Sequence, residues 1–493
     1  MQDSKTKKGI GAVDFFCLGF GAIVGVGWAV SVNGWMADSG GPVPAALGYL
    51  VTLILMVPIA LCYCELVPMY PVAGGGMAFA YQAFNEKIAF VSGWAAVGGF
   101  IGVIPWEAIQ VTDVLSYLIP GILEGEPLYT VAGTGIYLPT ILIAVVCSFL
   151  LFALNMRGVE SSAMVQKVLC FVLVGAGILG GIASLVGGSA ENLRPVYDVS
   201  NPAVYGPGLT EVTHNTIFGG MLSILSAAPF FLCGFETIPQ SVEEAGGSTT
   251  SVGKMVVLSV ALACVFYAVL LLCFGAGWPW QEFAHMTNPA AATMLAELYP
   301  GAAGQVFYWV IVLGAMAGLF TTWNGFFLAT PNLMMGMGRG RLIPAVFAKQ
   351  NKNKVAPAGL VFCLVLSLIG PFLGAGLIGS LTSFNSLGVM LSWVITAWCL
   401  VRLRKTRPDA PRPYRIPGGI WTGIFAGVVS AVVFVLLFIP NGPAFVGKVT
   451  VLMFVGWMVI GLVLYLASAP QRRAMSPEER EKQMFAHASQ QGE

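Results

Sequence analysis

Long runs of apolar residues, separated by short polar segments, fill nearly the whole chain. The runs reach about 20 residues or more, the length that an α-helix needs to cross the roughly 30 Å hydrocarbon layer of a bilayer. Ten-residue segments of alternating polarity, typical of membrane β-barrels, are absent from the sequence. The pattern predicts an all-α membrane protein with about twelve transmembrane helices, at residues 12–36, 43–67, 88–118, 137–154, 165–186, 216–239, 255–278, 304–328, 357–377, 378–401, 422–439 and 449–466.

The composition agrees with this prediction. Hydrophobic residues make up 57% of the chain and charged residues 10%, whereas a soluble domain carries about a quarter charged residues. A formal net charge of +1 gives no reason to expect nucleic acid as a partner, and the lipid bilayer is the expected surrounding. The 10 cysteines fall inside apolar runs, without a CxxC pair or a metal-ligand spacing. We therefore interpret them as small buried hydrophobes and expect no metal site and no cofactor.

Basic residues lie almost entirely on one side of the predicted helices. With the N-terminus inside, 22 of the 24 Lys and Arg residues fall on the cytoplasmic side, and only Arg194 and Lys448 fall outside. The positive-inside rule therefore predicts a multi-pass protein of the inner (cytoplasmic) membrane with both termini in the cytoplasm. A cleaved signal peptide is not expected, because the first apolar run is a full span.

Two predicted helices contain glycine and proline clusters in mid-span. The first helix has Gly25 and Gly27 in GFGAIVGVGW, and the sixth has Gly234 in APFFLCGFETIPQ. Breaks of this kind are tolerated in a membrane only where the freed backbone groups face protein, water or a ligand. The two breaks lie five helices apart, at the start of two five-helix sets of opposite topology, which is typical of inverted-repeat carriers.

The freed backbone groups suggest how a solute is held. The N–H groups of Val26 and Gly27 can hold a carboxylate, and the carbonyls around Phe230, Phe231 and Cys233 can accept from an ammonium group. The alternative is that the glycines only allow close helix packing. The matched pair of breaks favours the substrate site.

Two ionisable residues, Glu107 and Glu236, lie deep in the predicted hydrocarbon region, where charges are costly and usually functional. Glu107 is expected to pair with a positive group of the solute, because no basic side chain is found at its depth. A protonated, proton-carrying Glu107 and a Glu107 bonded to nearby backbone remain alternatives. Glu236 directly follows the second break and is expected to act in occlusion or protonation, with a structural hydrogen bond as the alternative.

Six segments resemble, in order, the amino acid-polyamine-organocation permease family, up to about residue 417. They are GAIVGVGWAVSVNGWMADSGGP, YCELVPMYPVAGGGMAFAYQAF, LNMRGVESSAMVQ, GFETIPQSVEEA, MGMGRGRLIPAVFAKQNKNKVAP and LRKTRPDAPRPYRIPGG. The resemblance implies a five-plus-five inverted repeat with two added helices, alternating access, and a central site between helices 1, 3, 6 and 8. The implied divisions are an N-terminal tail (1–11), a first repeat (12–188), an extracellular loop (189–214), a second repeat (215–402), helices 11 and 12 with the preceding loop (403–468), and a C-terminal tail (469–493).

The resemblance also implies which residues meet the solute. Val26 and Gly27 would bind its carboxylate, and on a gapless match of the third helices Ile104 and Glu107 would line the side-chain pocket. The site would thus be formed by helix 1 at one end of the solute and by helix 3 at the other.

Aromatic residues would close this site. Phe230 would occupy the gate before the second break, and Trp323 on helix 8 would form a wall. Trp28 is a further gating candidate, because an aromatic face both occludes a solute and attracts an ammonium group. Packing between helices is the alternative role for all three.

Coupling to an ion is less clearly indicated. Many proton-coupled members of the family place a lysine in helix 5 at the position of Leu173, and Lys167 lies six residues earlier. Sodium coupling would use paired hydroxyl groups on helix 8, which Thr321 and Thr322 offer, although the gapless match puts Leu319 at the ligand position. A proton and a sodium ion therefore both remain candidate co-ions.

The predicted function is secondary active transport of a small amino acid or amine by a permease or exchanger. A polyamine or amino-alcohol carrier is the nearest alternative. A channel would need a continuous polar lining, and a transporter-like sensor would bind its solute without flux. An enzyme is not expected, because no nucleophile, base or metal-ligand set converges in the sequence.

Overall fold

Twelve membrane-spanning segments are found in the part of the chain that the computed structural model describes, residues 9–119, 121–123, 125–200, 216–440 and 444–491. Nine of them, within these ranges, are long and apolar enough to cross a membrane by themselves. The all-α membrane fold predicted from the sequence is confirmed.

Two of the twelve segments are interrupted. The first consists of α1 (Ala12–Val24), α2 (Gly27–Val30) and α3 (Val32–Ser39), and the sixth consists of α9 (Ile217–Leu232) and α10 (Thr237–Gln240). The uninterrupted segments are α4 (Pro42–Met69), α6 (Glu86–Ser116), α7 (Leu138–Met156), α8 (Val159–Gly187), α11 (Thr249–Gly277), α14 (Ala302–Arg339), α15 (Pro357–Leu373), α16 (Ile378–Thr406), α17 (Ile420–Leu436) and α18 (Lys448–Ala467).

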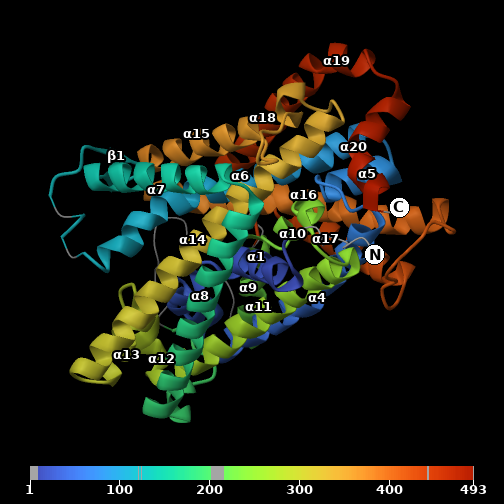
Figure 1. Cartoon of the computed structure of the whole chain (residues 1–493). Helices are drawn as coiled ribbons and strands as arrows, with labels where there is room; N and C mark the ends of the chain where they lie inside the picture. The colour runs from blue at the N-terminus through green and yellow to red at the C-terminus, as the bar shows by residue number, and fades with distance from the viewer. Residues whose placement is uncertain (1–8, 120, 124, 201–215, 441–443, 492–493) are drawn as a thin grey trace, which may run out of the picture.

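Short elements cover the ends of these segments. Near the termini they are α5 (Gly76–Ala83), α19 (Ala469–Arg473) and α20 (Pro477–Gln491), together with the 3₁₀ turns η2 (Val242–Glu244) and η3 (Ala345–Ala348). The remaining ones are η1 (Ala190–Leu193), α12 (Trp280–His285), α13 (Ala290–Leu298), η4 (Ala375–Leu377) and the antiparallel hairpin of β1 (Tyr129–Val131) and β2 (Thr134–Ile136). Figure 1 shows the hairpin at the end of the molecule opposite to both termini.

Helix ends follow local sequence signals. The Asn85 side chain accepts hydrogen bonds from the N–H groups of Lys87 and Ile88, both at 3.0 Å, and so caps α6. Proline occupies the first turn of α4, α7 and α15, where its missing N–H group leaves no hydrogen bond unmade. These caps set where the chain enters the bilayer.

The helix contacts show an internal two-fold relation. α1 packs on α11 as α9 packs on α4, and α6 packs on α16 as α14 packs on α8. α4 and α11 pack on each other, as do α7 and α15. Exchanging the first five segments with the next five reproduces each of these contacts, which is what an inverted repeat requires. The two interrupted segments are therefore brought to equivalent places on either side of the pseudo-axis.

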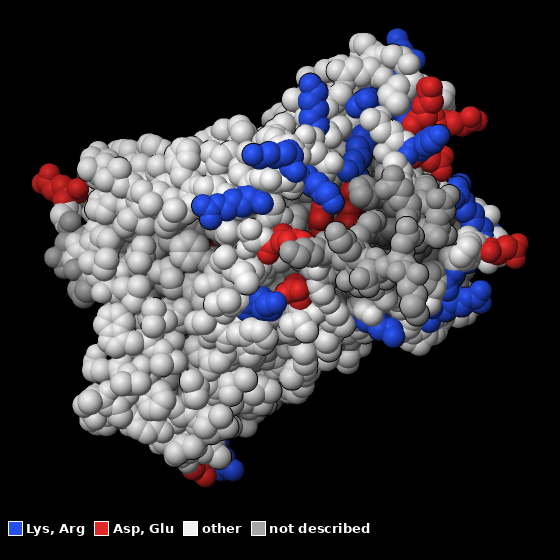
Figure 2. All heavy atoms as spheres, viewed as in Figure 1, with Lys and Arg blue, Asp and Glu red and all other residues white. Residues whose placement is uncertain are grey.

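Charge is concentrated at one end of the molecule. Figure 2 shows most of the visible Lys and Arg side chains over the half that carries both termini in Figure 1, and a largely uncharged remaining surface. At this end the buried carboxylate of Glu65 forms ion pairs with Arg404 and Arg412. The pairs tie α4 to α16 and to the loop that follows α16.

Both ends of the described chain are attached to this charged surface. The Ile10 N–H group donates to the Glu244 carbonyl at 3.0 Å, so the N-terminal segment lies beside the loop after α10. At the other end, Arg480 of α20 pairs with Glu86 at 2.6 Å, and Met484 is 1% exposed. The predicted C-terminal tail thus folds as a helix against the ends of α5, α6 and α14 that lie at this charged surface.

Candidate functional site

The first break opens the backbone between α1 and α2. Gly25 adopts a φ of +50°, and an added Cβ there would lie 2.7 Å from Thr322 Oγ1 on α14, so only glycine fits. The N–H groups of Gly25 and Val26 have no hydrogen-bond partner among the described residues. Two backbone donors are therefore available to a ligand at this point.

The second break is held by its own side chains. Gly234 adopts a φ of +122°, and its N–H group donates to Glu236 Oε2 at 2.8 Å. The Thr237 hydroxyl donates to the Gly234 carbonyl at 2.7 Å. The other carboxylate oxygen of Glu236 accepts a hydrogen bond from Nε1 of Trp393 on α16. Glu236 thus has a donor on each oxygen.

A buried cavity lies between the two breaks and α6. In this conformation its volume is about 20 Å³, room for about one or two water molecules and far below that of small-molecule sites, so a solute can enter only after the walls move apart. Its walls come from both breaks, α6 and α14, and are formed by Ala22, Ile23, Val24, Gly25, Val26, Gly27, Val103, Trp106, Glu107, Phe230, Phe231, Cys233 and Thr322.

Two neighbouring side chains on α6 bring unpaired polar atoms to this cavity. Glu107 is 2% exposed, and its Oε2 has no hydrogen-bond partner in the described part of the chain. Nε1 of Trp106 is likewise buried and unpaired there. None of the lining residues is Lys, Arg or His. A buried polar group without a partner costs free energy, so both atoms are suited to a ligand that pairs with them.

Aromatic rings form one side of the cavity. The Phe230 ring lies 5.3 Å from that of Trp106 and is perpendicular to that of Phe231 at 5.2 Å. Phe231 in turn packs edge-on against Trp35 of α3 at 4.8 Å. The aromatic contacts join the first and second breaks to α6, so the rings can enclose a solute placed between them.

The structure brings together seven of the residues predicted for the site. Those at the cavity are Gly25, Val26, Gly27, Glu107, Phe230, Cys233 and Thr322. The others lie outside its lining and are Trp28, Ile104, Gly234, Glu236, Thr321 and Trp323. The other six lining residues are Ala22, Ile23, Val24, Val103, Trp106 and Phe231. Of these, only the carbonyl group of Phe231 was considered from the sequence.

Three of the predicted residues outside the cavity lining, Trp28, Ile104 and Trp323, are packed inside the protein. Trp323 is fully buried and its ring stacks on Phe320 at 6.1 Å, and Trp28 packs edge-on against Phe266 at 6.4 Å. Ile104 is fully buried in α6, next to Val103, which does reach the cavity. Side chains of adjacent helical residues point about 100° apart. The gapless match therefore identified the correct part of α6 but the wrong face of the helix.

The hydroxyl groups of Thr321 and Thr322 on α14 are already bonded to backbone carbonyl groups. Thr321 donates to the Gly318 carbonyl at 2.7 Å, and Thr322 contacts the carbonyls of Gly318 and Gly21 at 3.3 and 3.4 Å. The side chain of Leu173 approaches the same place, beside Gly318. Within the described ranges no group of His, Cys, Asp and Glu is arranged to hold a metal ion.

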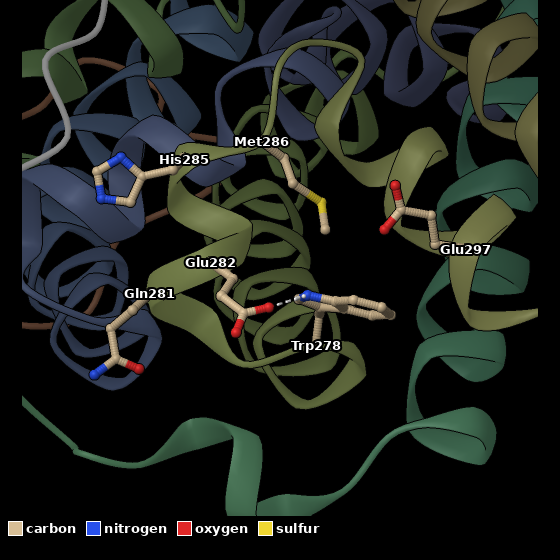
Figure 3. A pocket seen from close by; sticks show the side chains of 6 residues that line it. All are labelled: Trp278, Gln281, Glu282, His285, Met286 and Glu297. Atoms are coloured by element: carbon tan, nitrogen blue, oxygen red, sulfur yellow. Dashed lines mark hydrogen bonds between the residues drawn. The ribbon is translucent and has the colours of Figure 1, made fainter.

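A wider hollow lies on the surface at α12 and α13. Figure 3 shows Trp278 and Glu282 pointing toward each other, joined by a hydrogen bond of 3.0 Å, while His285 points away from the pair. Glu297 faces the hollow from α13. Its polar groups are exposed to solvent, so the hollow lacks the buried, unpaired atoms that mark the central cavity.

The chain is similar to a known protein family and to several known transport proteins. Residues 10–463 match the family model described as amino acid permease. The branched-chain amino acid permease BcaP of Bacillus subtilis is 23% identical over 473 residues, covering 94% of this chain and 93% of that protein. The vacuolar cationic amino acid transporter 4 of Arabidopsis thaliana is 26% identical over 82% of this chain and 64% of that protein. The L-asparagine permease of Escherichia coli is 23% identical over a match that covers 97% of this chain and 93% of that protein.

Proposed function

Because this chain belongs to the amino acid permease family, we propose that it carries a small amino acid or amine across the cytoplasmic membrane by alternating access. The cavity between the two helix breaks is the proposed central site. One observation carries the proposal: unpaired backbone N–H groups and an unpaired carboxylate face the same buried cavity.

The first break is the proposed site for the solute's carboxylate. The N–H groups of Gly25 and Val26 are free donors, and Gly27 begins α2 beside them. Backbone donors of a broken helix are suited to an anionic group, because they bind it without introducing a charged side chain into the membrane.

Glu107 is the proposed partner of a positive group. A buried carboxylate needs a counter-charge or a proton, and the described lining supplies no basic side chain. A solute ammonium group supplies that charge when it binds, next to the rings of Phe230 and Trp106. The site therefore favours amines and cationic amino acids over acidic ones, in keeping with the name of the cationic transporter among the relatives.

The charge distribution supports a cytoplasmic location of both termini. Both lie at the end of the molecule where Lys and Arg side chains gather. In this orientation α10, α5 and the end of α14 form the cytoplasmic side of the carrier, and α12 and α13 the outer side.

Counterflow in proteoliposomes tests the proposal. Vesicles loaded with unlabelled L-lysine, L-leucine, L-asparagine or cadaverine are diluted into a trace of the same labelled solute, and saturable accumulation is expected for at least one of them. Glu107→Gln should weaken binding of a cationic solute by about 1.5 to 3 kcal/mol, the range for a hydrogen bond to a charged group. Glu126→Gln, which changes an exposed loop residue, is the matched control.

Three results would contradict the proposal. Flux that does not saturate and shows no counterflow would indicate a channel. Unchanged binding of every cationic probe by the Glu107→Gln variant would remove the charge-pairing role of Glu107, and a loss of pH dependence in that variant would assign it to proton transfer instead.

A further inference from the structure

The loop between α4 and α5, residues 70–75, is attached to the continuation of the second break. The N–H group of Ala73 donates to the Glu243 carboxylate at 2.9 Å, and that of Gly74 donates to the Gln240 side chain at 3.0 Å. Gln240 is the last residue of α10, and Glu243 belongs to η2. A movement of the second break toward or away from the charged end therefore has to carry this loop with it or break both hydrogen bonds.

The Glu243 carboxylate also reaches a third element. It forms an ion pair with Arg339 at the end of α14, and the two side chains are only 6% and 11% exposed. The loop, η2 and the end of α14 thus pack together on the charged-end side of the second break.

α20 packs on the same loop and on α5, beside which it lies in Figure 1. The Phe485 ring lies 6.0 Å from that of Tyr70 in the loop and 6.4 Å from that of Tyr81 in α5. The Gln82 side chain, also in α5, donates to the Glu481 carboxylate at 2.7 Å. The loop and α5 are therefore in contact with the C-terminal helix as well as with the sixth segment.

Two further contacts join α20 to neighbouring long helices. Arg480 pairs with Glu86 at the start of α6, at 2.6 Å. Met484 is 1% exposed and packs directly on Gly340, just after α14, where it leaves no room for another side chain. α20 thus connects the loop and α5 to the ends of α6 and α14.

These contacts are few enough to be reversible. The sequence of α20, PEEREKQMFAHASQQ, is largely polar, and Met484 and Phe485 are its only large apolar side chains. Two apolar side chains bury little area, and an ion pair whose Glu86 side chain is 29% exposed contributes little. The helix can therefore detach while the membrane-spanning segments stay folded.

We propose that α20 is a releasable latch, which when docked keeps the loop of residues 70–75 and α5 against α10 and η2, and which has to be released before the central site opens at the charged end. The proposal rests on the proposed transport function, because opening at each end in turn is a step of alternating access. In the orientation proposed above, this end is cytoplasmic. The C-terminal helix then controls how fast the carrier opens to the cytoplasm without touching the solute.

Hydrogen–deuterium exchange of the purified full chain tests the latch without any solute. Met484→Asp puts a charge against Gly340 and should release α20, so that exchange in residues 70–84 and 238–245 becomes faster by about tenfold. Ala486→Asp is the matched control, because it adds the same charge at an exposed position of the same helix. It should leave both peptides unchanged.

The peptide of residues 238–245 distinguishes a latch from a local contact. It is joined to the loop by Gln240 and Glu243, so its exchange reports on the loop and not on the surface that α20 covers. Truncation after Ser476 removes α20 altogether and should give the same faster exchange. Wild-type exchange of residues 238–245 in the folded, truncated protein would overturn the proposal.

Cross-linking tests the opposite direction in proteoliposomes. Gln82→Cys combined with Glu481→Cys, joined by a short bis-maleimide, should slow counterflow at least about tenfold, whereas each single-cysteine variant treated in the same way should keep the wild-type rate. The ten native cysteines are buried. Met484→Asp should accelerate counterflow about threefold.

The solute is L-lysine, L-leucine, L-asparagine or cadaverine, whichever the wild type accumulates. Undiminished counterflow by the cross-linked protein would contradict the latch. If the wild type carries none of the four solutes, the proposed function loses its support, and the exchange measurement still decides whether α20 restrains the loop.

Discussion

Gly234 in the second break lies directly against the backbone of Ala22 in α1, and an added Cβ would approach the Ala22 carbonyl oxygen to 2.7 Å. The two interrupted helices therefore touch where each of them changes direction. Because Gly234 also has a φ of +122°, neither a side chain nor an ordinary backbone conformation fits at this position. A shift of one break has to be accompanied by a shift of the other.

This contact predicts that Gly234→Ala is strongly disruptive. The positive φ alone costs about 1 to 3 kcal/mol for a residue with a side chain, and the clash with Ala22 adds to this cost. We expect a lower unfolding temperature and loss of transport. Gly175→Ala on α8 is the control, because no atom lies within 4 Å of its added Cβ. Equal stability of the two variants would contradict the close contact between the breaks.

The unpaired indole of Trp106 predicts a specific loss of affinity. Trp106→Phe keeps an aromatic ring at the cavity but removes the buried Nε1 donor, so solute binding should weaken by about 0.5 to 1.5 kcal/mol. Trp323→Phe is the matched comparison, since Trp323 is also buried and its Nε1 is also unpaired in the described part of the chain, but it packs outside the cavity. Binding measured by isothermal titration should change little in the second variant. The reverse order would make Trp323 the wall of the site.

The two hydrogen bonds to Glu236 predict a structural role for this carboxylate. In Glu236→Gln an amide N–H₂ group must face either the Gly234 N–H group or Trp393 Nε1, so two donors oppose each other at a cost of about 1 to 3 kcal/mol. We expect a slower maximal uptake and a lower unfolding temperature. The shape of the pH profile of uptake should match that of the wild type. A flattened profile would instead assign proton transfer to Glu236.

A tight contact at Gly27 predicts that its substitution blocks transport without unfolding the protein. A Cβ at Gly27 would lie 3.0 Å from the Phe231 ring, so the larger side chain in Gly27→Val displaces the cavity wall. Uptake should be lost, while membrane insertion and the yield of folded protein stay near wild type. Full uptake by Gly27→Val would remove the first break from the transport site.

The overall fold could be predicted because apolar length in a membrane is a strong constraint. The run at 88–118 is observed as Glu86–Ser116, displaced by two residues at each end. The run at 304–328 is observed as the much longer α14, Ala302–Arg339, because the helix continues past the hydrocarbon layer into a segment that hydropathy no longer marks. Polar elements outside the bilayer, such as α20 and the β1–β2 hairpin, give no hydropathy signal and were not predicted.

The candidate site could be predicted only in part. Glycine clusters indicated both breaks, because few residues other than glycine adopt the backbone angles of Gly25 and Gly234. The choice between Ile104 and Val103 depends on helix rotation, which a gapless match does not define. The hydrogen bond between Glu236 and Trp393 joins residues 157 positions apart, and no local pattern in the sequence reveals such a pair.

The docking of α20 has a practical consequence for experiments on this carrier. Arg480 holds this helix to Glu86 at the start of α6, and Phe485 packs on Tyr70 and Tyr81 beside the loop before α6. A fluorescent protein or affinity tag fused directly after α20 is therefore attached to a folded part of the charged end of the molecule. Reporter fusions with a flexible spacer, compared with the untagged chain, are needed to measure the kinetics of the native molecule.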